Sequence, residues 1–148
     1  MKFRSGSGRQ RNESKKIILF VCVENAGRSQ MAEAFFRKYA PEGYTAASAG
    51  TRPTSQVNAI AVEAMKEVGI DISRQKPKII DEDMIKSSAQ AVNMGCMDHT
   101  ECPMLFINNV IDWGIDDPKG QPIERVRQIR DEIEKRVKEL AQNVKADG

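Results

Sequence analysis

Residues 17–29 read Ile-Ile-Leu-Phe-Val-Cys-Val-Glu-Asn-Ala-Gly-Arg-Ser, and this stretch decides the fold. Its first five residues form an apolar, β-branched run that predicts a buried strand. Beyond Ser29, apolar side chains recur at helical spacing until Pro41 stops the pattern; they are Met31, Ala32, Phe35 and Tyr39. The sequence therefore predicts a strand, a short loop and a helix that begins at about Arg28.

The loop between this strand and this helix has the features of an anion site. Amides at a helix N-terminus lack intrahelical acceptors and carry the positive end of the helix dipole, so they bind tetrahedral oxyanions. Cys22 stands at the mouth of the loop, where the nucleophilic thiolate is favoured, and Arg28 can grip an oxyanion with two donors. We predict a cysteine-nucleophile enzyme that acts on a phosphate-like anion, with an oxyanion-binding loop formed by Val23, Glu24, Asn25, Ala26, Gly27 and Arg28.

Individual residues of the loop refine this prediction. Gly27 lets the backbone approach a ligand closely, and Asn25 tolerates a left-handed conformation. The carboxylate of Glu24 would repel an anion, so we expect it to face solvent while its amide points inward. Ser29 is either a helix-start residue or a hydroxyl that hydrogen-bonds the thiolate. The alternative for Cys22 is a buried apolar residue at a strand end, which is common for a free cysteine.

The composition is that of one ordinary globular domain, with 148 residues, 40% apolar, 30% charged and a net charge of +2. This balance does not indicate nucleic-acid or membrane partners, and no apolar run approaches the ~20 residues that span a bilayer. Without a secretory signal, we expect a cytoplasmic location and a monomer. Residues 1–14 are predicted to be a flexible tail, with a nucleic-acid arm as the alternative, and residues 15–148 a single domain.

The rest of the chain alternates strand and helix patterns. We predict further strands over residues 44–50, 89–94 and 110–115. Further helices are predicted over residues 57–68, 81–86 and from Pro122 onward. Thr54 or Ser55 would cap the first of these helices. Such alternation predicts an α/β fold, a three-layer α/β/α sandwich with a four-stranded parallel sheet.

A thiolate that attacks a tetrahedral oxyanion needs a proton donor for the leaving oxygen. Asp117 precedes Pro118 in a turn after a predicted strand, so it can reach the same sheet edge as Cys22. Asp117 is the best-placed candidate for this proton donor, and the alternative is ordinary Asp-Pro turn chemistry. Trp113 is expected to pack near the end of that strand rather than to stack on a ligand.

Cys96 and Cys102 lie in a predicted loop, with His99 between them. Zinc binding is one interpretation, although the spacing does not match paired two-residue cysteine knuckles. A redox pair that feeds electrons to Cys22 fits a chain with three thiols in a reducing compartment better. His99 would polarise a neighbouring thiol or lie in solvent. We predict no bound metal and no cofactor.

The segment from Cys22 to Glu33 resembles the active-site segment of arsenate reductases with the low-molecular-weight protein tyrosine phosphatase fold. Further stretches match that family in the same order: Ser48-Ala49-Gly50, Asn93 to Cys96, Cys102-Pro103, Trp113 to Pro118 and Arg130 to Ile133. The resemblance covers about Lys16 to Leu140 and implies a low-molecular-weight phosphatase-like fold.

The resemblance implies a thiol relay. Cys22 would be the nucleophile that attacks arsenate, with Arg28 as the anion clamp, Ser29 as the thiolate partner and Asp117 as the general acid. Cys96 would then attack Cys22 of the arsenic adduct and release arsenite, and Cys102 would take over the disulfide. Thioredoxin or a similar thiol reductant would reduce that disulfide. The alternative is a phosphatase that hydrolyses phosphotyrosine or small phosphoesters through a phosphocysteine.

The chain departs from the family pattern at two positions. Gly27 stands where thioredoxin-coupled members have a further cysteine, which the relay does not need. Some members bind potassium with residues that match Asn25, Glu33 and Ser48 and with an aspartate. Lys78 stands where that aspartate aligns, so we expect its ammonium group to replace the ion.

Overall fold

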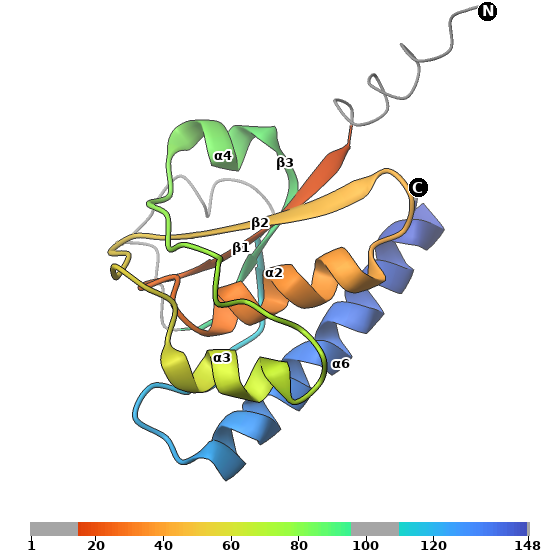
Figure 1. Ribbon diagram of the computed structural model, residues 1–148. Coiled ribbons are helices and arrows are strands. Elements are labelled where there is room, and N and C mark those ends of the chain that lie inside the picture. The colour runs from red at the N-terminus through yellow and green to blue at the C-terminus, as the bar shows by residue number, and fades with distance from the viewer. Residues whose placement is uncertain (1–14, 96–109, 148) are drawn as a thin grey trace, which may run out of the picture.

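The structure is a computed structural model that describes residues 15–95 and 110–147. Its centre is a four-stranded sheet in the order β2-β1-β3-β4, in which every neighbouring pair is parallel. The strands are β1 (Lys16–Cys22), β2 (Tyr44–Gly50), β3 (Ser88–Asn93) and β4 (Val110–Asp112). The helices are α2 (Arg28–Tyr39), α3 (Ala59–Lys66), α4 (Glu82–Ser87) and α6 (Ile123–Asp147) (Figure 1).

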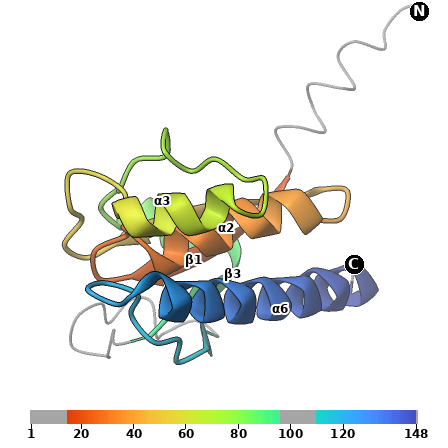
Figure 2. The same cartoon turned by 60° about the horizontal axis from the view of Figure 1, so that its bottom comes forward.

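The two faces of β1 set the layers of the molecule. Side chains alternate along a strand, and Ile18, Phe20 and Cys22 pack in the cluster that contains the apolar residues of α2, α3 and α6. Leu19 and Val21 face the opposite side, where they pack with Ile85 of α4. Helices α2, α3 and α6 therefore cover one face of the sheet, as Figures 1 and 2 show, and α4 covers the other. The predicted α/β fold with a four-stranded parallel sheet is confirmed.

The predicted bounds of α3 and the predicted end of β4 are wrong, and β3 and α4 are each shifted by one residue from their prediction. Helix α3 begins at Ala59 rather than at residue 57, because Asn58 is its N-cap and accepts a hydrogen bond from the Ile60 amide at 2.9 Å. Neither Thr54 nor Ser55 caps it. Strand β4 ends at Asp112 rather than at residue 115. Gly114 has a φ of 61°, which turns the chain out of the extended conformation.

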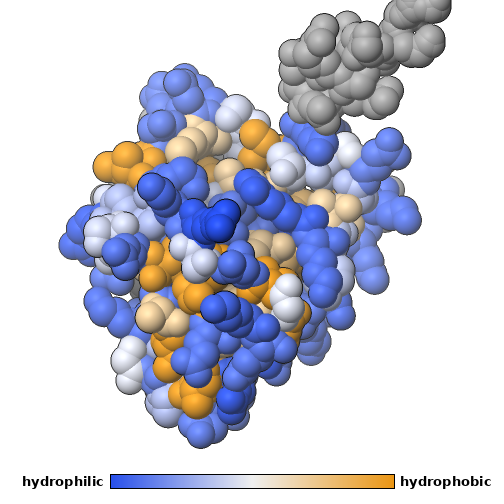
Figure 3. Space-filling model, in the orientation of Figure 1, coloured by the Kyte–Doolittle hydropathy of each residue, from blue (hydrophilic) through white to orange (hydrophobic). Residues whose placement is uncertain are grey.

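The long helix α6 carries the predicted amphipathic pattern. Its buried apolar stripe faces α2 and α3, and consists of Val126, Ile129, Ile133, Val137, Leu140 and Ala141. The surface in Figure 3 is mostly hydrophilic, with hydrophobic side chains gathered in smaller areas. Trp113 packs 5.9 Å from Phe20 between ring centroids, so its predicted packing role is confirmed. Within residues 15–95 and 110–147, no helix has the length and apolar character needed to cross a membrane.

Glu67, at the end of α3, joins this helix to α6 through two arginines. Its carboxylate accepts hydrogen bonds from Arg127 at 2.7 Å and from the buried Arg130 at 2.9 Å. The hydrogen bond from Arg127, supported by Arg130, lowers the pKa of Glu67. Arg130 also donates to the carbonyl of Ala64 at 2.9 Å, so the junction links the backbone of one helix to the side chains of the other.

We expect Glu67→Gln to lower the free energy of unfolding at neutral pH but not in acid. A carboxyl group whose pKa is lowered by folding stabilises the fold above its unfolded pKa, about 4.3 for glutamate. That contribution is lost as the pH falls through the lowered folded value. Urea titrations from neutral to acidic pH should therefore give free energies of unfolding for the two proteins that become equal at low pH. A difference that stays constant with pH would contradict the ion-pair explanation.

Candidate functional site

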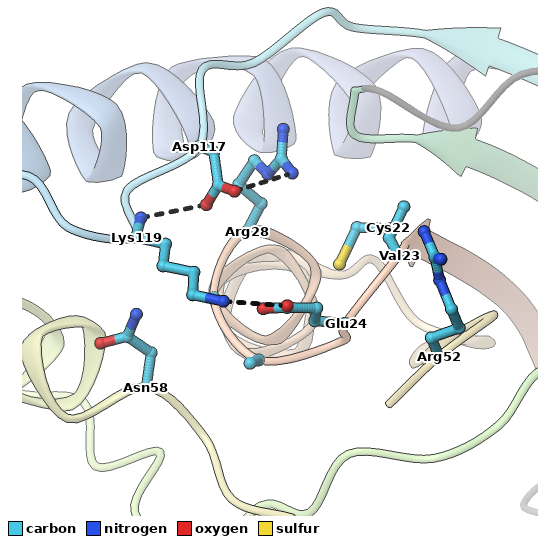
Figure 4. A pocket seen from close by; sticks show the side chains of 10 residues that line it. Cys22, Val23, Glu24, Arg28, Arg52, Asn58, Asp117 and Lys119 are labelled. Carbon is cyan, nitrogen blue, oxygen red and sulfur yellow. Dashed lines mark hydrogen bonds and ion pairs between the residues drawn. The ribbon is translucent and has the colours of Figure 1, made fainter. Parts of the chain in front are cut away.

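The loop between β1 and α2 forms one wall of a pocket of about 300 Å³. The loop leaves the carboxyl end of β1, the edge at which open α/β sheets bind ligands. The opposite wall comes from the segment after β4 (Figure 4). The pocket is lined by Cys22, Val23, Glu24, Ala26, Gly27, Arg28, Arg52, Asn58, Asp117 and Lys119.

The sulfur of Cys22 lies at the base of this loop and receives hydrogen bonds from it. The Asn25 amide donates to Sγ at 3.2 Å, and the hydroxyl of Ser29 lies 2.9 Å from Sγ. Because Asn25 Nδ2 donates to Ser29 Oγ at 2.7 Å, the hydroxyl proton of Ser29 is left to point at the sulfur. Two donors therefore face Sγ, an arrangement that stabilises a thiolate.

Asn25 holds the loop in shape. Its φ of 52° is left-handed, which asparagine tolerates better than most residues. Its side chain is fully buried, and its Oδ1 accepts hydrogen bonds from the Lys78 amide at 2.8 Å and from Gln30 Nε2 at 3.1 Å. A backbone amide can only donate, so the contact with Lys78 fixes the orientation of the Asn25 side chain and directs Nδ2 to Ser29.

Gly50, at the end of β2, allows the loop to pass directly over the sheet edge. A Cβ at this position would lie 2.4 Å from the Val23 carbonyl oxygen and 3.0 Å from the Asn25 nitrogen. Among the described residues, four loop amides donate to no acceptor, those of Val23, Glu24, Ala26 and Gly27. A run of unpaired amides beside a helix N-terminus is suited to binding an oxyanion.

Arg28 and Asp117 meet on the other side of the pocket. Arg28 is buried, and its Nη1 donates to the Ile115 carbonyl at 2.7 Å. Its Nη2 lies 3.8 Å from Asp117 Oδ2, and the Asp117 side chain is 57% exposed. The guanidinium is also confined by Gly95, where a Cβ would lie 2.6 Å from Nη1. The structure thus brings together the predicted nucleophile, clamp and acid, which come from segments about 90 residues apart.

Glu24 lies at the rim of the pocket, where its carboxylate accepts a hydrogen bond from Lys119 Nζ at 3.0 Å. Three lining residues were missed from the sequence: Arg52, Asn58 and Lys119. Arg52 follows β2 by two residues, and Gly50 pairs with Cys22 in the register, so the sheet-edge argument could have found it. Asn58 and Lys119 reach the pocket through tertiary packing, which no local pattern shows.

Cys96, Cys102 and His99 lie outside the described residues, so the predicted redox pair and its zinc alternative stay predictions. The described chain leads to the site, however, because β3 pairs with β1 up to Asn93, opposite Val21. The amide of Met94 then donates to the Val21 carbonyl at 2.9 Å, one residue before Cys22. Met94 and Gly95, the last described residues of this segment, therefore leave the sheet beside the nucleophile.

Lys78 lies beside the buried carboxylate of Glu33. Its Nζ is 4.0 Å from Glu33 Oε1, which also accepts a hydrogen bond from Ser48 at 2.6 Å. Arg37 Nη2 lies 3.2 Å from Glu33 Oε2. Two cations thus compensate one carboxylate that is only 5% exposed.

This geometry supports the prediction that the Lys78 ammonium replaces a potassium ion. We expect potassium at millimolar concentration to leave the melting temperature of the protein unchanged relative to equal concentrations of tetramethylammonium. Lys78→Asp, which restores a carboxylate, should make the melting temperature potassium-dependent. A stabilisation of the unsubstituted protein by potassium over that control would contradict the prediction.

The site as a whole is that of a cysteine-dependent enzyme that binds oxyanions. The chain belongs to the low molecular weight phosphotyrosine protein phosphatase family, whose model matches residues 17–148.

Relatives of the chain include reductases and phosphatases. It is 41% identical to an arsenate reductase of Brevibacillus brevis over 131 residues, which cover 88% of this chain and 97% of that one. The arginine phosphatase YwlE from Geobacillus stearothermophilus has a similar structure, with a TM-score of 0.79, 26% identity, and coverage of 89% of this chain and 94% of that one. A thioredoxin-dependent arsenate reductase of Corynebacterium glutamicum has a TM-score of 0.76 and 30% identity, and covers 97% of this chain and 74% of that one.

Proposed function

We infer that the protein is an arsenate reductase that draws its electrons from thioredoxin or a similar thiol reductant. The observation that carries this inference is the 41% identity to an arsenate reductase over nearly the whole of both chains. The pocket supports it, because Cys22, Arg28 and the loop amides surround a space suited to a tetrahedral oxyanion. The oxyanion and the reductant are the two partners that this function requires.

The first step makes a bond between sulfur and arsenic. The thiolate of Cys22 attacks arsenate, which the loop amides and the Arg28 guanidinium hold. Ser29 and the Asn25 amide stabilise the thiolate before attack. One hydroxyl of arsenate takes a proton from Asp117 and leaves as water. The product of this step is a Cys22–arsenic(V) adduct.

The second step transfers two electrons. The Cys96 thiolate attacks Cys22 Sγ, and the electron pair of the sulfur–arsenic bond passes to arsenic, which leaves as arsenite. Cys22 and Cys96 are then joined by a disulfide. Cys102 attacks Cys96, frees Cys22, and leaves a Cys96–Cys102 disulfide that a dithiol protein of the thioredoxin class reduces. A relay of this kind needs a reducing compartment, so we propose a cytoplasmic location.

The proposal is tested by coupling the full chain to thioredoxin, thioredoxin reductase and NADPH. We expect NADPH oxidation only when arsenate is added, with one arsenite formed for each NADPH consumed. Cys22→Ser should abolish the reaction. If the wild-type protein consumes no NADPH with thioredoxin, glutaredoxin or a low-molecular-weight thiol as donor, the reductase proposal is wrong.

A phosphatase is the second candidate, and the structural similarity to the arginine phosphatase favours it. The same thiolate and aspartate could form and hydrolyse a phosphocysteine. The described residues that line the pocket include no aromatic side chain to hold the ring of phosphotyrosine, which makes a small phosphoester or phosphoarginine the better test substrate. Turnover of these substrates that exceeds arsenate turnover would favour this candidate.

A further inference from the structure

A carboxylate stands at the mouth of the pocket that an anion must enter. Glu24 is two residues beyond Cys22, and its side chain lines the pocket while remaining 38% exposed. Its Oε2 accepts a hydrogen bond from Lys119 Nζ at 3.0 Å. Lys119 comes from the segment between β4 and α6, so this ion pair joins two segments across the pocket, as Figure 4 shows.

The charge of the pocket lining depends on Lys119. Among the described residues, the lining carries three cations, Arg28, Arg52 and Lys119, and two carboxylates, Glu24 and Asp117. With both carboxylates ionised and Cys22 left out of the count, the balance is one positive charge. If Lys119 were neutral, this balance would be zero, and the Glu24 carboxylate would repel an incoming dianion without its paired cation beside it.

The ammonium group of Lys119 can be removed without removing its structural link to the acid. The Lys119 backbone amide donates to Asp117 Oδ1 at 3.0 Å. Any residue except proline can make this bond. A substitution of the side chain therefore leaves the turn around Asp117 its hydrogen bond and removes only the charge that faces Glu24.

We propose that Lys119 sets the affinity of the pocket for dianionic oxyanions by neutralising Glu24 at its mouth. Lys119 makes and breaks no bond of the substrate, so it is a binding residue that acts through another side chain. The inference rests on the proposed function for the identity of the physiological anion, arsenate. The same charges act on inorganic phosphate, which therefore serves as the probe.

The test compares Lys119→Met, Glu24→Gln and the double variant in the full-length protein. Inorganic phosphate is titrated against the alkylation of Cys22 by iodoacetamide, which is followed by peptide mass mapping. Lys119→Met should need about five- to tenfold more phosphate for half-protection, and the difference should shrink at high salt. Glu24→Gln should need no more phosphate than the wild type. In the double variant, the phosphate concentration for half-protection should return to within about twofold of the wild-type value, because both charges are gone.

A matched control is Lys86→Met, which breaks the exposed pair with Glu82 on α4, 3.1 Å apart, and should leave protection unchanged. The inference is wrong if phosphate protects Cys22 in the Lys119→Met variant as well as in the wild type. It is also wrong if the double variant needs as much phosphate for half-protection as the Lys119→Met variant. Protection by phosphate needs no electron transfer, so the two proposals can fail separately. If Lys119→Met weakens protection, the double variant restores it and the protein still turns over no arsenate, only the reductase proposal is refuted. Arsenate turnover without this pattern of protection would refute only the role of Lys119.

Discussion

The Cys102→Ser variant should reduce arsenate to one arsenite per chain and then stop, whereas the Cys96→Ser variant should form no arsenite. In the proposed relay, Cys96 would release arsenite by attacking Cys22, so its loss should leave the arsenic adduct in place. Cys102 acts only afterwards, and without it the first turnover ends in a Cys22–Cys96 disulfide. Rapid-quench measurement of arsenite against enzyme concentration distinguishes the two results, and mass mapping identifies the trapped disulfide.

The hydrolysis of a small aryl phosphate is the internal control for this pair of variants. Hydrolysis through a phosphocysteine needs Cys22, Arg28 and Asp117 but neither of the later thiols. Both variants should therefore retain this activity within about twofold, which shows that the fold and the pocket are intact. Multiple turnovers of arsenate by either variant with thioredoxin as donor would overturn the relay, and equal loss of both activities would point to misfolding.

Arg28→Lys should lower kcat/KM for arsenate by about 10²–10³-fold, the range seen when a preorganised donor to a transition-state anion is lost. The guanidinium is buried and held by the Ile115 carbonyl at 2.7 Å, which fixes its orientation toward the pocket. A lysine keeps the charge but cannot hold that carbonyl and present two parallel donors to an oxyanion at once. The loss should appear in kcat as well as in KM, because the oxyanion charge is redistributed as the bond to Cys22 forms.

Arg127→Lys is the matched control for this substitution. It makes the same exchange of cations at the exposed junction with Glu67, the C-cap of α3, where Arg127 donates to the carboxylate at 2.7 Å. The pocket residue Asn58 lies at the other end of this helix. Kinetic constants should not change in this variant, although stability should fall slightly. If Arg28→Lys retained more than about a tenth of wild-type kcat/KM, the arginine would be only a source of charge, and the two-donor clamp would be refuted.

The sequence predicted the elements that rest on local pattern and missed what depends on contacts between distant segments. The strand at Tyr44–Gly50 was predicted with its observed bounds, because Gly50 and the following turn punctuate it. The start of α3 was misplaced, since Val57 is apolar in the same phase as the helix and only the contact of Asn58 shows where the cap lies. Helix boundaries set by a capping side chain are weakly encoded in periodicity.

The candidate site divides in the same way. Cys22, Arg28 and Ser29 belong to one local motif, and Asp117 followed from the rule that the carboxyl ends of parallel strands share an edge. The use of Asn25 as a link between the loop and the Lys78 amide could not be predicted, because it joins residues 53 positions apart. The Glu24–Lys119 pair was missed for the same reason, as it spans 95 positions.

The attachment of the anion loop to β2 and to the Lys78 segment has a consequence for chemical damage. The Arg52 amide after β2 donates to the Val23 carbonyl at 2.8 Å, and the Lys78 amide donates to Asn25 Oδ1 at 2.8 Å. The loop is thus held by hydrogen bonds on two sides, so we expect it to separate from the sheet only when these segments open with it. Peroxide should therefore over-oxidise the Cys22 sulfur only through the pocket mouth, and bound phosphate should suppress that reaction at every denaturant concentration below the unfolding midpoint.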